Sequence, residues 1–600
     1  VGERGTCFAE LRLRDAKLVI DGSCLYHHLG LGSANEFRRG GDYGAFAAAV
    51  RDFFGSLRAC RVAAFVLLDG GRGAADRKLP TLRDRAAERL RAARGLSLGQ
   101  GGRLLPLLAR EAFVQTLRRL RVPFAQCLAE ADREIASLAN RWGCPVLSQD
   151  SDFCVFDLVG GYCPLSAFQW RDVCAGGPQG SYIPALCFSA ERFCGRFGPL
   201  QKSLLPLFAA LSGNDYMDAL EGFFSRVRLP GGPQRGRHGR MRGLLGWLAQ
   251  FSGPEEALDG VLGRLAAHRR EQTRELLRAA MEDYAPCDTD LEEFFQGGQY
   301  DGKAASSSGL PRWVLGALLK GELAPFISDA LVLRSTFLHV QVEDMQRPSA
   351  HSTALPIRCV IYGLLLSAPR RAEAAGTQGA ALPAICEFDR VQNSLKKNFV
   401  HPASLPTHFC DGCFSLDKLT EVPTLCRQLL LLETLGVTVS LLESLPGHLQ
   451  LPVAVTCYWT RCSEPRVNLH KLKALLLMIV SGELHRITND PDLTVPHAED
   501  DSTAYNQLLK WKEETSQKKD FDLDAAHSFC QWQCCLQMGL YLNQLLCSPL
   551  SEPDLASLYS GTLVHRLYQE LKSTPSVENL FSSSPKMTQL YQVLLNTVMS

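Results

Sequence analysis

The sequence contains no long apolar run. Its uncharged stretches, such as residues 204–213 and 474–480, fall far short of the roughly 20 apolar residues that a helix needs to cross a bilayer. The N-terminal residues are charged and include no apolar segment of the kind found in secretory signals. We therefore expect no transmembrane helix, no membrane partner and a protein that stays inside the cell.

The sequence also lacks the spacing of a disulfide framework or a zinc site. Its 22 cysteines are scattered through a chain long enough to bury a core without crosslinks, which favours reduced thiols. Cys410 and Cys413 lie close to His408, but no second ligand pair stands at zinc-finger spacing. The stretches GGRGAAD and LSLGQGG lack the Gly-Lys-Ser/Thr of a phosphate-binding loop. We expect no structural zinc and no nucleotide cofactor.

Net charge is nearly absent, at +1, yet the two parts of the chain differ. Residues up to 250 include 34 basic and 23 acidic side chains, which leaves 30 basic and 40 acidic for the rest. A basic N-terminal part indicates a polyanionic partner, although an ordinary solvated surface has the same composition. The 600 residues, 46% hydrophobic and 21% charged, are typical of a globular protein of about two to four domains.

Between residues 13 and 165, short apolar runs alternate with stretches of helical periodicity, which predicts an α/β fold with a mostly parallel sheet. The expected strands are 17–20, 62–68, 122–128, 145–147 and 154–156. The expected helices are 42–57, 109–120 and 132–141, and helices dominate after residue 185. We expect a first core part at 1–69, a cap insertion at 70–120, the rest of the core with a basic loop at 121–250, and a largely helical region at 251–600.

Acidic side chains follow four of the expected strands, at the point where each strand ends. They are Asp21, Asp69, Glu130, Asp132, Asp150 and Asp152. Because the carboxyl ends of parallel strands share one edge of a sheet, we expect these acids to lie together where α/β proteins bind ligands. Asp215, after an apolar helix, is a candidate for the same place. The alternative for any single acid is a helix cap or a turn residue.

Carboxylates gathered in one crevice repel each other. At about 4 Å and an effective dielectric constant of about 20, each like-charged pair costs on the order of 4 kcal/mol, so cations are needed. Oxygen ligands without accompanying His or Cys favour Mg²⁺, with Mn²⁺ as the alternative, over Zn²⁺. Two such ions would activate a water molecule and stabilise the leaving oxygen of a phosphodiester.

Basic side chains at helical spacing interrupt the α/β pattern after residue 70. They include Lys78, Arg83, Arg85, Arg89, Arg91 and Arg94. A cationic helix directly after an acidic strand end is suited to draw in and hold a phosphate. The alternative is a solvated helix with ion pairs to Asp84 and Glu88.

The segments that carry these residues resemble the signature segments of the flap endonuclease and XPG-like structure-specific nucleases, most closely the asteroid homologues. The matching segments are VIDGSCLYHH, FVLLDGG, CLAEADREIASLA, VLSQDSDFCVF and LSGNDYMDALEG. In the C-terminal half, LAPFISDALVLR, FCQWQCCLQMGLYLNQLL and LYSGTLVHRL resemble the asteroid homologues in particular. The resemblance spans nearly the whole chain.

This resemblance implies a PIN-like, flap-endonuclease-like core with a helical arch, and metal-site roles for all seven acids. It implies catalytic roles for Lys78 and Arg85 on the arch helix, and that Tyr26 or His27 stacks on the base beside the scissile phosphate. The expected reaction is hydrolysis of single-stranded DNA at flaps or overhangs near duplex junctions, with two Mg²⁺ ions. We expect a role in DNA repair and a nuclear location.

A run of arginines stands where such nucleases usually carry a helix-hairpin-helix that holds duplex DNA. The arginines are Arg226, Arg228, Arg235, Arg237, Arg240 and Arg242. We expect them to contact phosphates, and the alternative is a solvated loop. Three other interpretations of the chain stay open. One is a catalytically impaired scaffold whose helical C-terminal region binds protein partners, and another is an RNA-directed PIN-like ribonuclease. The third is a phosphatase acting on small phosphoesters, which is disfavoured because the first strand ends VIDGS and not in the Asp-x-Asp of an aspartyl-phosphate nucleophile.

Overall fold

A computed structural model describes the chain at residues 7–32, 37–73, 76, 78–176, 180–212, 237–297, 309–367, 382–405, 414–489, 499–514 and 521–600. The contacts between residues divide the chain into two compact units. Unit 1 comprises residues 1–28, 52–70 and 121–308, and unit 2 comprises 29–51, 71–120 and 309–600. Among the described helices, none has the length and apolar character needed to span a membrane.

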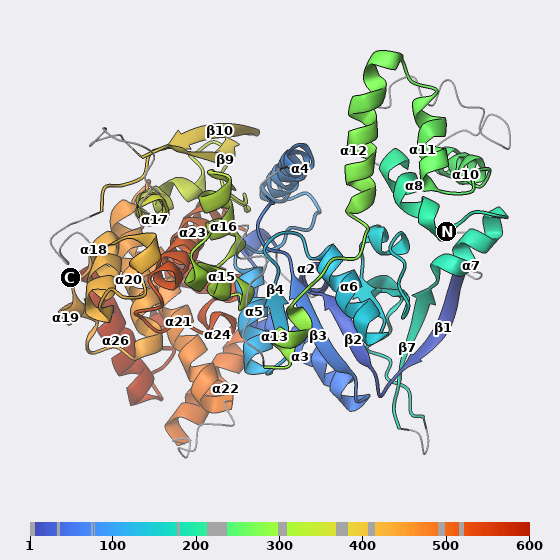
Figure 1. The fold of residues 1–600 in the computed structure, drawn as a ribbon. Helices are drawn as coiled ribbons and strands as arrows, with labels where there is room; N and C mark the ends of the chain where they lie inside the picture. The colour runs from blue at the N-terminus through green and yellow to red at the C-terminus, as the bar shows by residue number, and fades with distance from the viewer. Residues whose placement is uncertain are drawn as a thin grey trace, which may run out of the picture. The chain divides into compact units, whose positions relative to one another are not determined.

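Unit 1 contains a seven-stranded sheet in the order β1-β7-β6-β5-β2-β3-β4 (Figure 1). The strands are β1 (Phe8–Leu13), β2 (Lys17–Asp21), β3 (Ala63–Leu68), β4 (Phe124–Gln126), β5 (Val146–Ser148), β6 (Tyr162–Pro164) and β7 (Ile183–Phe188). Strands β4, β3, β2, β5 and β6 run parallel, whereas β7 and β1 are antiparallel additions. In β2, Leu18, Val19 and Ile20 are fully buried, as expected of a central parallel strand covered on both faces. The predicted mostly parallel α/β core is confirmed.

Helices of unit 1 lie against the sheet or form a second cluster beyond it. They are α6 (Asp132–Trp142), α7 (Ala190–Cys194), α8 (Leu205–Ser212), α10 (Arg237–Leu248), α11 (Pro254–Leu262), α12 (Arg270–Glu282) and α13 (Leu291–Phe295). Helices α8, α10, α11 and α12 bury their leucines and Trp247 in a core of their own. Helices α2 (Gly22–Gly32) and α3 (Tyr43–Ala59) begin in one unit and end in the other.

The strand predicted at residues 154–156 is wrong. The chain instead forms a short 3₁₀ helix, η2 (Ser151–Cys154), in which the carboxylate of Asp150 accepts a hydrogen bond from the backbone N–H of Asp152. The rings of Phe153, in η2, and of Phe156, two residues beyond its end, have centroids 5.6 Å from each other. The apolar spacing that resembles a strand thus belongs to a short helix and the turn that follows it.

Unit 2 is largely helical, which confirms the prediction for the C-terminal region. Its helices after residue 300 are α15 (Arg312–Leu319), α16 (Pro325–Val332), α17 (Leu355–Leu366), α18 (Thr424–Leu435), α19 (Val439–Leu442), α20 (Gly447–Cys462), α21 (Leu469–Asn489), α22 (Glu499–Glu514), α23 (Leu523–Leu545), α24 (Leu555–Leu558), α25 (Gly561–Ser573) and α26 (Pro585–Met599). Every residue of α23 from Ala525 to Asn543 is buried. This helix is therefore the centre of the unit.

Two earlier segments of the chain pack onto this C-terminal body. The hydroxyl of Tyr43 donates to Gln533 of α23 over 2.7 Å, and the amide of Gln537 donates to the carbonyl of Leu107 over 3.2 Å. Helix α5 (Ala109–Arg119) contacts α24. Residues 29–51 and 71–120 thus belong to the same unit as residues 309–600. The domain boundaries 1–69, 70–120, 121–250 and 251–600 stay a prediction.

The basic helix predicted after residue 70 is α4 (Leu79–Ser97), which starts with Pro80 in its first turn. Its Leu90, Ala93 and Leu96 are buried against a segment of unit 2 that includes Val340 and Met345. The helix is thus amphipathic, with an apolar face in a core and its arginines on the outside.

Unit 2 also contains a three-stranded sheet that the sequence analysis did not predict. Its order is β10-β9-β8, with β8 (Ser335–Phe337) parallel to β9 (Ile385–Val391) and β9 antiparallel to β10 (Ser394–Val400). Gln392, with φ at 52°, and Asn393 form the two-residue turn of the β9–β10 hairpin. Such primed turns match the twist of paired strands.

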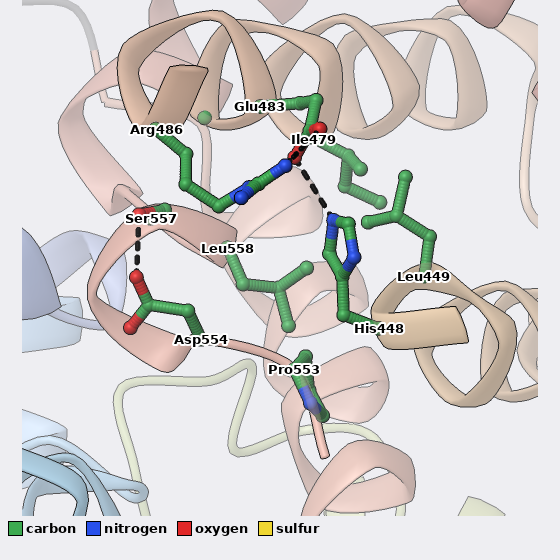
Figure 2. A pocket seen from close by; sticks show the side chains of 10 residues that line it. His448, Leu449, Ile479, Glu483, Arg486, Pro553, Asp554, Ser557 and Leu558 are labelled. Atoms are coloured by element: carbon green, nitrogen blue, oxygen red, sulfur yellow. Dashed lines mark hydrogen bonds and ion pairs between the residues drawn. The ribbon is translucent and has the colours of Figure 1, made fainter. Parts of the chain in front are cut away.

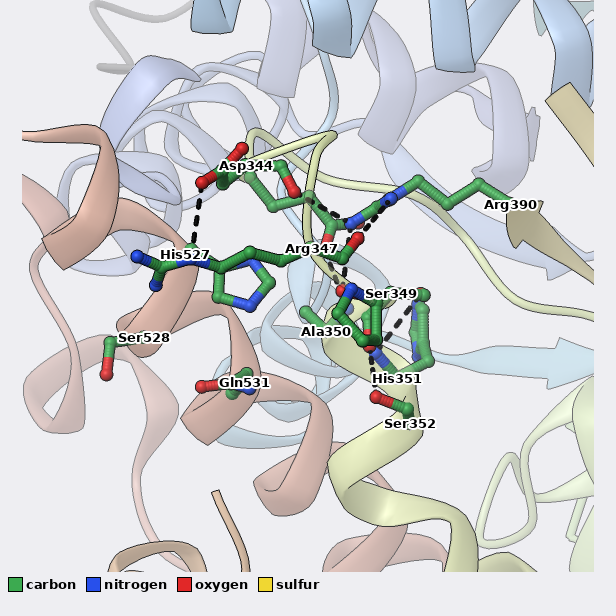
Figure 3. A network of polar contacts seen from close by, with 12 residues as sticks. Asp344, Arg347, Ser349, Ala350, His351, Ser352, Arg390, His527, Ser528 and Gln531 are labelled. Atoms are coloured by element: carbon green, nitrogen blue, oxygen red, sulfur yellow. Dashed lines mark hydrogen bonds and ion pairs between the residues drawn. The ribbon is translucent and has the colours of Figure 1, made fainter. Parts of the chain in front are cut away.

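Buried ion pairs join this sheet to its neighbours in unit 2. Arg390 of β9 donates to the carboxylate of Glu343 over 2.8 Å and to three backbone carbonyls, all inside a network shown in Figure 3. Arg358 of α17 holds Glu387 of β9 through two hydrogen bonds of 2.6 and 3.0 Å. Neither arginine is more than 2% exposed. The network fixes β9 in one register and position.

Candidate active site at the carboxyl edge of the sheet

Asp21 is the central acid of the site. It ends β2, where it stands opposite Leu67 of β3, and it is only 5% exposed. Its carboxylate accepts hydrogen bonds from the backbone N–H of Cys24 (2.9 Å) and from the hydroxyl of Ser148 (2.6 Å) at the end of β5. Burial, and next the charge of Asp69, raise the pKa of Asp21. A buried carboxylate with a like-charged neighbour is the situation that a bound cation relieves.

Asp69 follows β3 and links the ends of three segments. Its backbone N–H donates to the hydroxyl of Ser23 (3.0 Å), and its carboxylate accepts from the backbone N–H of Ala131 (2.9 Å). Next to it, a Cβ at Gly70 would lie 1.9 Å from the carbonyl oxygen of Cys127. Only glycine permits this approach, which keeps the end of β3 beside the segment that carries Glu130 and Asp132.

Asp150 and Asp152 follow β5 in the short helix η2. The carboxylate of Asp150 accepts from the backbone N–H of Asp152 (3.0 Å), and the N–H of Asp150 donates to the hydroxyl of Ser148 (3.0 Å). Ser148 thus lies between Asp21 and Asp150 and orients both. Asp150 does cap η2, which is the alternative role considered above for a single acid. The cap uses one oxygen of its carboxylate, and the other oxygen takes no part in it.

Glu130 and Asp132 lie on either side of the start of α6. Glu130 is exposed and Asp132 is the first residue of the helix. The charges of Asp150, Asp132 and Asp152 all raise the pKa of Tyr284, although burial is the larger cause. Asp132, after β4, and Asp150 and Asp152, after β5, therefore act on one common neighbour.

Two residues of this site, Glu134 and Tyr284, were not predicted from the sequence. Glu134, on the first turn of α6, has its pKa raised by burial and by the charge of Asp69. Glu134 stands two residues after Asp132, so its nearness to the predicted acids was visible in the sequence. Tyr284 donates its hydroxyl to the carboxylate of Asp152 over 3.2 Å. Nothing in the sequence pattern links Tyr284 to an acid so far away in the chain.

Oxygen atoms predominate among the side chains around these acids. Burial and the charge of Asp21 raise the pKa of Cys24 to about 12, and burial and the charge of Asp152 raise that of Cys154 to about 12. Carboxylates and hydroxyls are the donors that Mg²⁺ prefers. The chemistry of the donor set thus fits a hard divalent ion. Within the described part of the chain, no three His, Cys, Asp or Glu side chains are arranged to hold one ion.

Some predicted site residues lie outside the described part of the chain, and two others lie on helix α10. Asp215, Arg226, Arg228 and Arg235 lie outside the described residues, as do the side chain of Arg237 and the cysteines at 410 and 413. Arg240 and Arg242 are exposed on helix α10, so they are not in a loop as predicted. The apolar spacing of Leu244, Leu245, Trp247 and Leu248 forms that helix by packing into the unit 1 core.

The residues predicted to contact the substrate are divided between unit 1 and unit 2. Tyr26 and His27 lie on α2 within unit 1, half-buried, with ring centroids 4.7 Å apart. Lys78 and Arg85 belong to unit 2, where Lys78 precedes α4 and Arg85 is on its second turn, both exposed. Every cysteine of the described part is free, as predicted.

A pocket in unit 2 offers no room for a substrate. It has a volume of about 20 Å³, enough for about one water molecule, and is lined by His448, Glu483, Arg486 and Asp554 among others (Figure 2). Glu483 accepts hydrogen bonds from Arg486 (2.7 and 2.9 Å) and contacts His448 (2.9 Å). We interpret this group as an ion cluster that joins α20 and α21.

This cluster predicts a defined acid sensitivity. Burial alone would raise the pKa of Glu483, but Arg486 and His448 outweigh it and lower the pKa from 4.5 to about 2. A pKa that is lower in the folded than in the unfolded state stabilises the fold at pH values above the unfolded pKa. This stabilisation is lost as pH falls from about 4.5 towards 2. We measure Tm from pH 6 to pH 2.5. Below pH 4.5, the Tm of Glu483→Gln is expected to depend less on pH than the Tm of the wild type. An unchanged profile would contradict the ion cluster.

Parts of the chain match two protein-family models and a solved structure. A family model described as "XPG domain containing" matches residues 107–221, and one described as "Asteroid N-terminal domain" matches residues 448–600. The catalytic core of Rad2 in complex with DNA substrate is 16% identical and covers 48% of this chain and 78% of that chain, with a TM-score of 0.26.

Relatives match almost the whole chain. The single-strand DNA endonuclease ASTE1 of Mus musculus is 50% identical over 598 residues, which cover 99% of this chain and 88% of the relative. The protein of the same name from Homo sapiens is 48% identical over 602 residues, with the same coverage. Protein asteroid of Drosophila melanogaster is 31% identical over 46% of this chain and 38% of its own length. The chain belongs to the asteroid family of XPG-domain proteins.

Proposed function

We propose that this chain is a structure-specific endonuclease that hydrolyses phosphodiester bonds in single-stranded DNA, at flaps or overhangs near duplex junctions. The observation that carries the proposal is the set of acids at the ends of β2, β3, β4 and β5, on one edge of a parallel sheet. Relatives that match 99% of the chain are named single-strand DNA endonucleases, which supports the same substrate. A role in DNA repair and a nuclear location follow from that substrate.

Two Mg²⁺ ions are the proposed cofactors. Asp150, Asp152 and Asp215 would hold one ion, and Asp21, Asp69, Glu130 and Asp132 would hold the other directly or through water. When bound, such ions lower the pKa of a water molecule and stabilise charge on the leaving oxygen. Ser148 and the backbone N–H of Cys24 support this role because they orient Asp21 without neutralising it.

The other predicted residues would position the DNA. Lys78 and Arg85 would hold the scissile phosphate and offset the negative charge that develops on it. Tyr26 or His27 would stack on the neighbouring base, a contact that contributes roughly 1–3 kcal/mol. Arg240 and Arg242, with the arginines before them, would contact phosphates without reading sequence.

The proposal is tested with end-labelled single-stranded, 5′-flap, 3′-flap, overhang and RNA substrates. We expect the full chain to cut DNA in Mg²⁺ and to stop when EDTA is added. Asp150→Ala/Asp152→Ala should remove cutting and leave binding to the same DNA nearly unchanged, because these acids repel phosphates and help only through metal.

Three results would contradict this proposal in different ways. Faster cutting of RNA than of matched DNA would favour the ribonuclease. A folded, DNA-binding protein that cuts no substrate would favour the scaffold, and pull-down with residues 309–600 present or mutated would then seek its protein partners. Cutting that survives EDTA would exclude the metal mechanism.

A further inference from the structure

Strand β10 is an open edge of the small sheet of unit 2. Among the described strands it pairs with β9 alone, and five of its seven residues are exposed. Proteins usually protect such edges, often with lysines, because an open edge invites pairing with another chain. Lys396 and Lys397 fit that purpose. Phe399 on the same strand is apolar and 70% exposed, so it does not protect the edge and needs another explanation.

Side chains alternate along β10, so Lys397 and Phe399 project from one face. Lys397 stands opposite Phe388, and its ammonium lies 5.5 Å from the centre of that ring. The Phe388 ring stacks on Phe337 of β8 with centroids 4.4 Å apart and planes at 7°. Arg72, the third residue after Asp69, lies 5.1 Å from the Phe337 ring. This ladder holds Lys397 over the face that also presents Phe399.

The same ladder is anchored at the base of the arch helix. Arg72 forms ion pairs with Asp76 and with Asp329 of α16, each at 3.2 Å, and donates to the carbonyl of Ser335 in β8 over 2.6 Å. Arg72 thus joins the segment after β3 to α16 and to β8 within unit 2. Strand β10 of the same sheet contacts α4.

On this side of unit 2, the five arginines of α4 outnumber its two acids, Asp84 and Glu88, and Glu88 lies 3.9 Å from Arg91. Strand β10 contacts α4 (Figure 1), whose exposed basic residues include Arg83, Arg85 and Arg91. The two acids of β9 do not neutralise the lysines, because Glu387 is buried against Arg358, and Asp389 is buried and accepts from Ser349 over 3.0 Å. Exposed cations beside an exposed aromatic ring are the pattern by which proteins hold single-stranded nucleic acid.

We propose that β10 binds single-stranded DNA along its edge, with Lys397 on a phosphate and Phe399 stacked on a base at one face, and Lys396 on a phosphate from the opposite face, and so extends the basic surface of α4. This proposal rests on the proposed function, since it names a second place at which the same substrate is held. A peptide that adds a strand to the edge is disfavoured, because the two lysines oppose strand pairing and attract a polyanion.

The test measures binding of the full chain to a fluorescent 30-nucleotide single strand and to the matching duplex, in Ca²⁺ or EDTA. Lys396→Glu/Lys397→Glu is compared with Lys418→Glu/Lys586→Glu, which makes the same charge change at exposed lysines of unit 2 outside the hairpin. We expect the hairpin variant to lose about tenfold or more in affinity for the single strand. Its salt dependence should fall by a slope of about 1.4, for two lost phosphate contacts. The control should bind like the wild type.

Phe399→Ala separates stacking from charge. Bases are available for stacking in a single strand but not in a duplex, so this variant should bind the single strand about fivefold or more weakly and the duplex like the wild type. Its side chain is exposed, so thermal unfolding should match the wild type. Equal losses on both DNAs, or no loss on either, would overturn the stacking contact.

The two proposals fail in different ways. If the wild type binds and cuts single-stranded DNA while both hairpin variants match it, the hairpin site is wrong and the endonuclease stands. If the wild type neither binds nor cuts the single strand, both proposals fall. If single-strand affinity is unchanged but the hairpin variants lose binding to an extended peptide, the edge is a peptide site and the DNA site is excluded.

Discussion

Asp21→Asn is expected to abolish cleavage and to make the metal-free protein more stable. Asn has the shape of Asp. Its amide oxygen can accept from the backbone N–H of Cys24, whereas its NH2 group would donate to the hydroxyl of Ser148, so that this hydrogen bond reverses its direction. Asn cannot supply a charged ligand, so cleavage should fall at least about a hundredfold. The substitution also removes a buried charge that lies next to Asp69. Relief of that repulsion should raise Tm by about 2–4 °C for each kcal/mol gained.

Thermal unfolding and cleavage should therefore move in opposite directions, and both are measured on the same preparations. Asp157→Asn is the control, because Asp157 lies beyond β5, the strand that pairs with β2, but is exposed and pairs with Lys202 over 2.7 Å. The control should keep wild-type cleavage. Added Mg²⁺ should stabilise the wild type and the control more than Asp21→Asn. An Asp21→Asn protein that cuts DNA at the wild-type rate would show that Asp21 is a structural acid.

Arg390→Ala is expected to destabilise unit 2 by about 3–5 kcal/mol, since it leaves Glu343 buried without its charged partner. Neither side chain of the pair is exposed, and Arg390 also satisfies the carbonyls of Arg347, Asp344 and Pro348. Urea unfolding followed by hydrogen exchange in residues 335–400 measures the loss where it occurs.

A double variant separates charge from packing. Glu343→Leu/Arg390→Met removes both charges, so it should be less destabilised than Arg390→Ala. It should not regain full stability, because the three carbonyls still lack a donor. The exposed Arg334→Ala, next to β8, is the control and should cost less than about 1 kcal/mol. Equal stability of Arg390→Ala and the wild type would refute the role assigned to this network.

Much of the nuclease core was predictable because its signal is local. The apolar run of β2 is visible in the sequence, and each acid stands close behind its own strand, β2, β3, β4 or β5. Parallel pairing then brings the acids to one edge of the sheet. The strand predicted at 154–156 failed because its apolar spacing belongs to the short helix η2 and the turn that follows it. Tyr284 was missed because its hydrogen bond to Asp152 depends on the path of the chain between them.

The small sheet of unit 2 was missed for a different reason. Strand β10 has the sequence SLKKNFV and is mostly exposed, so it shows neither a buried apolar run nor a clean alternation. Its partner β9 carries charged residues at Glu387, Asp389 and Arg390, which suggest a surface segment. All three are buried because partners elsewhere in unit 2 satisfy them. Such partners are not visible from the local sequence.

The packing of α4 has a consequence for the order in which the protein is made. The helix is complete at Ser97, whereas the segment that covers its apolar face begins at Val340. On the ribosome, the nascent chain therefore carries its arch helix uncovered while the whole acidic edge of the sheet is already synthesised. A message that stops before Val340 would encode Asp21 to Asp152 in full, and yet its product would expose Leu90 and Leu96. Such a truncated chain is expected to be cleared by chaperones and proteases rather than to act as a smaller nuclease.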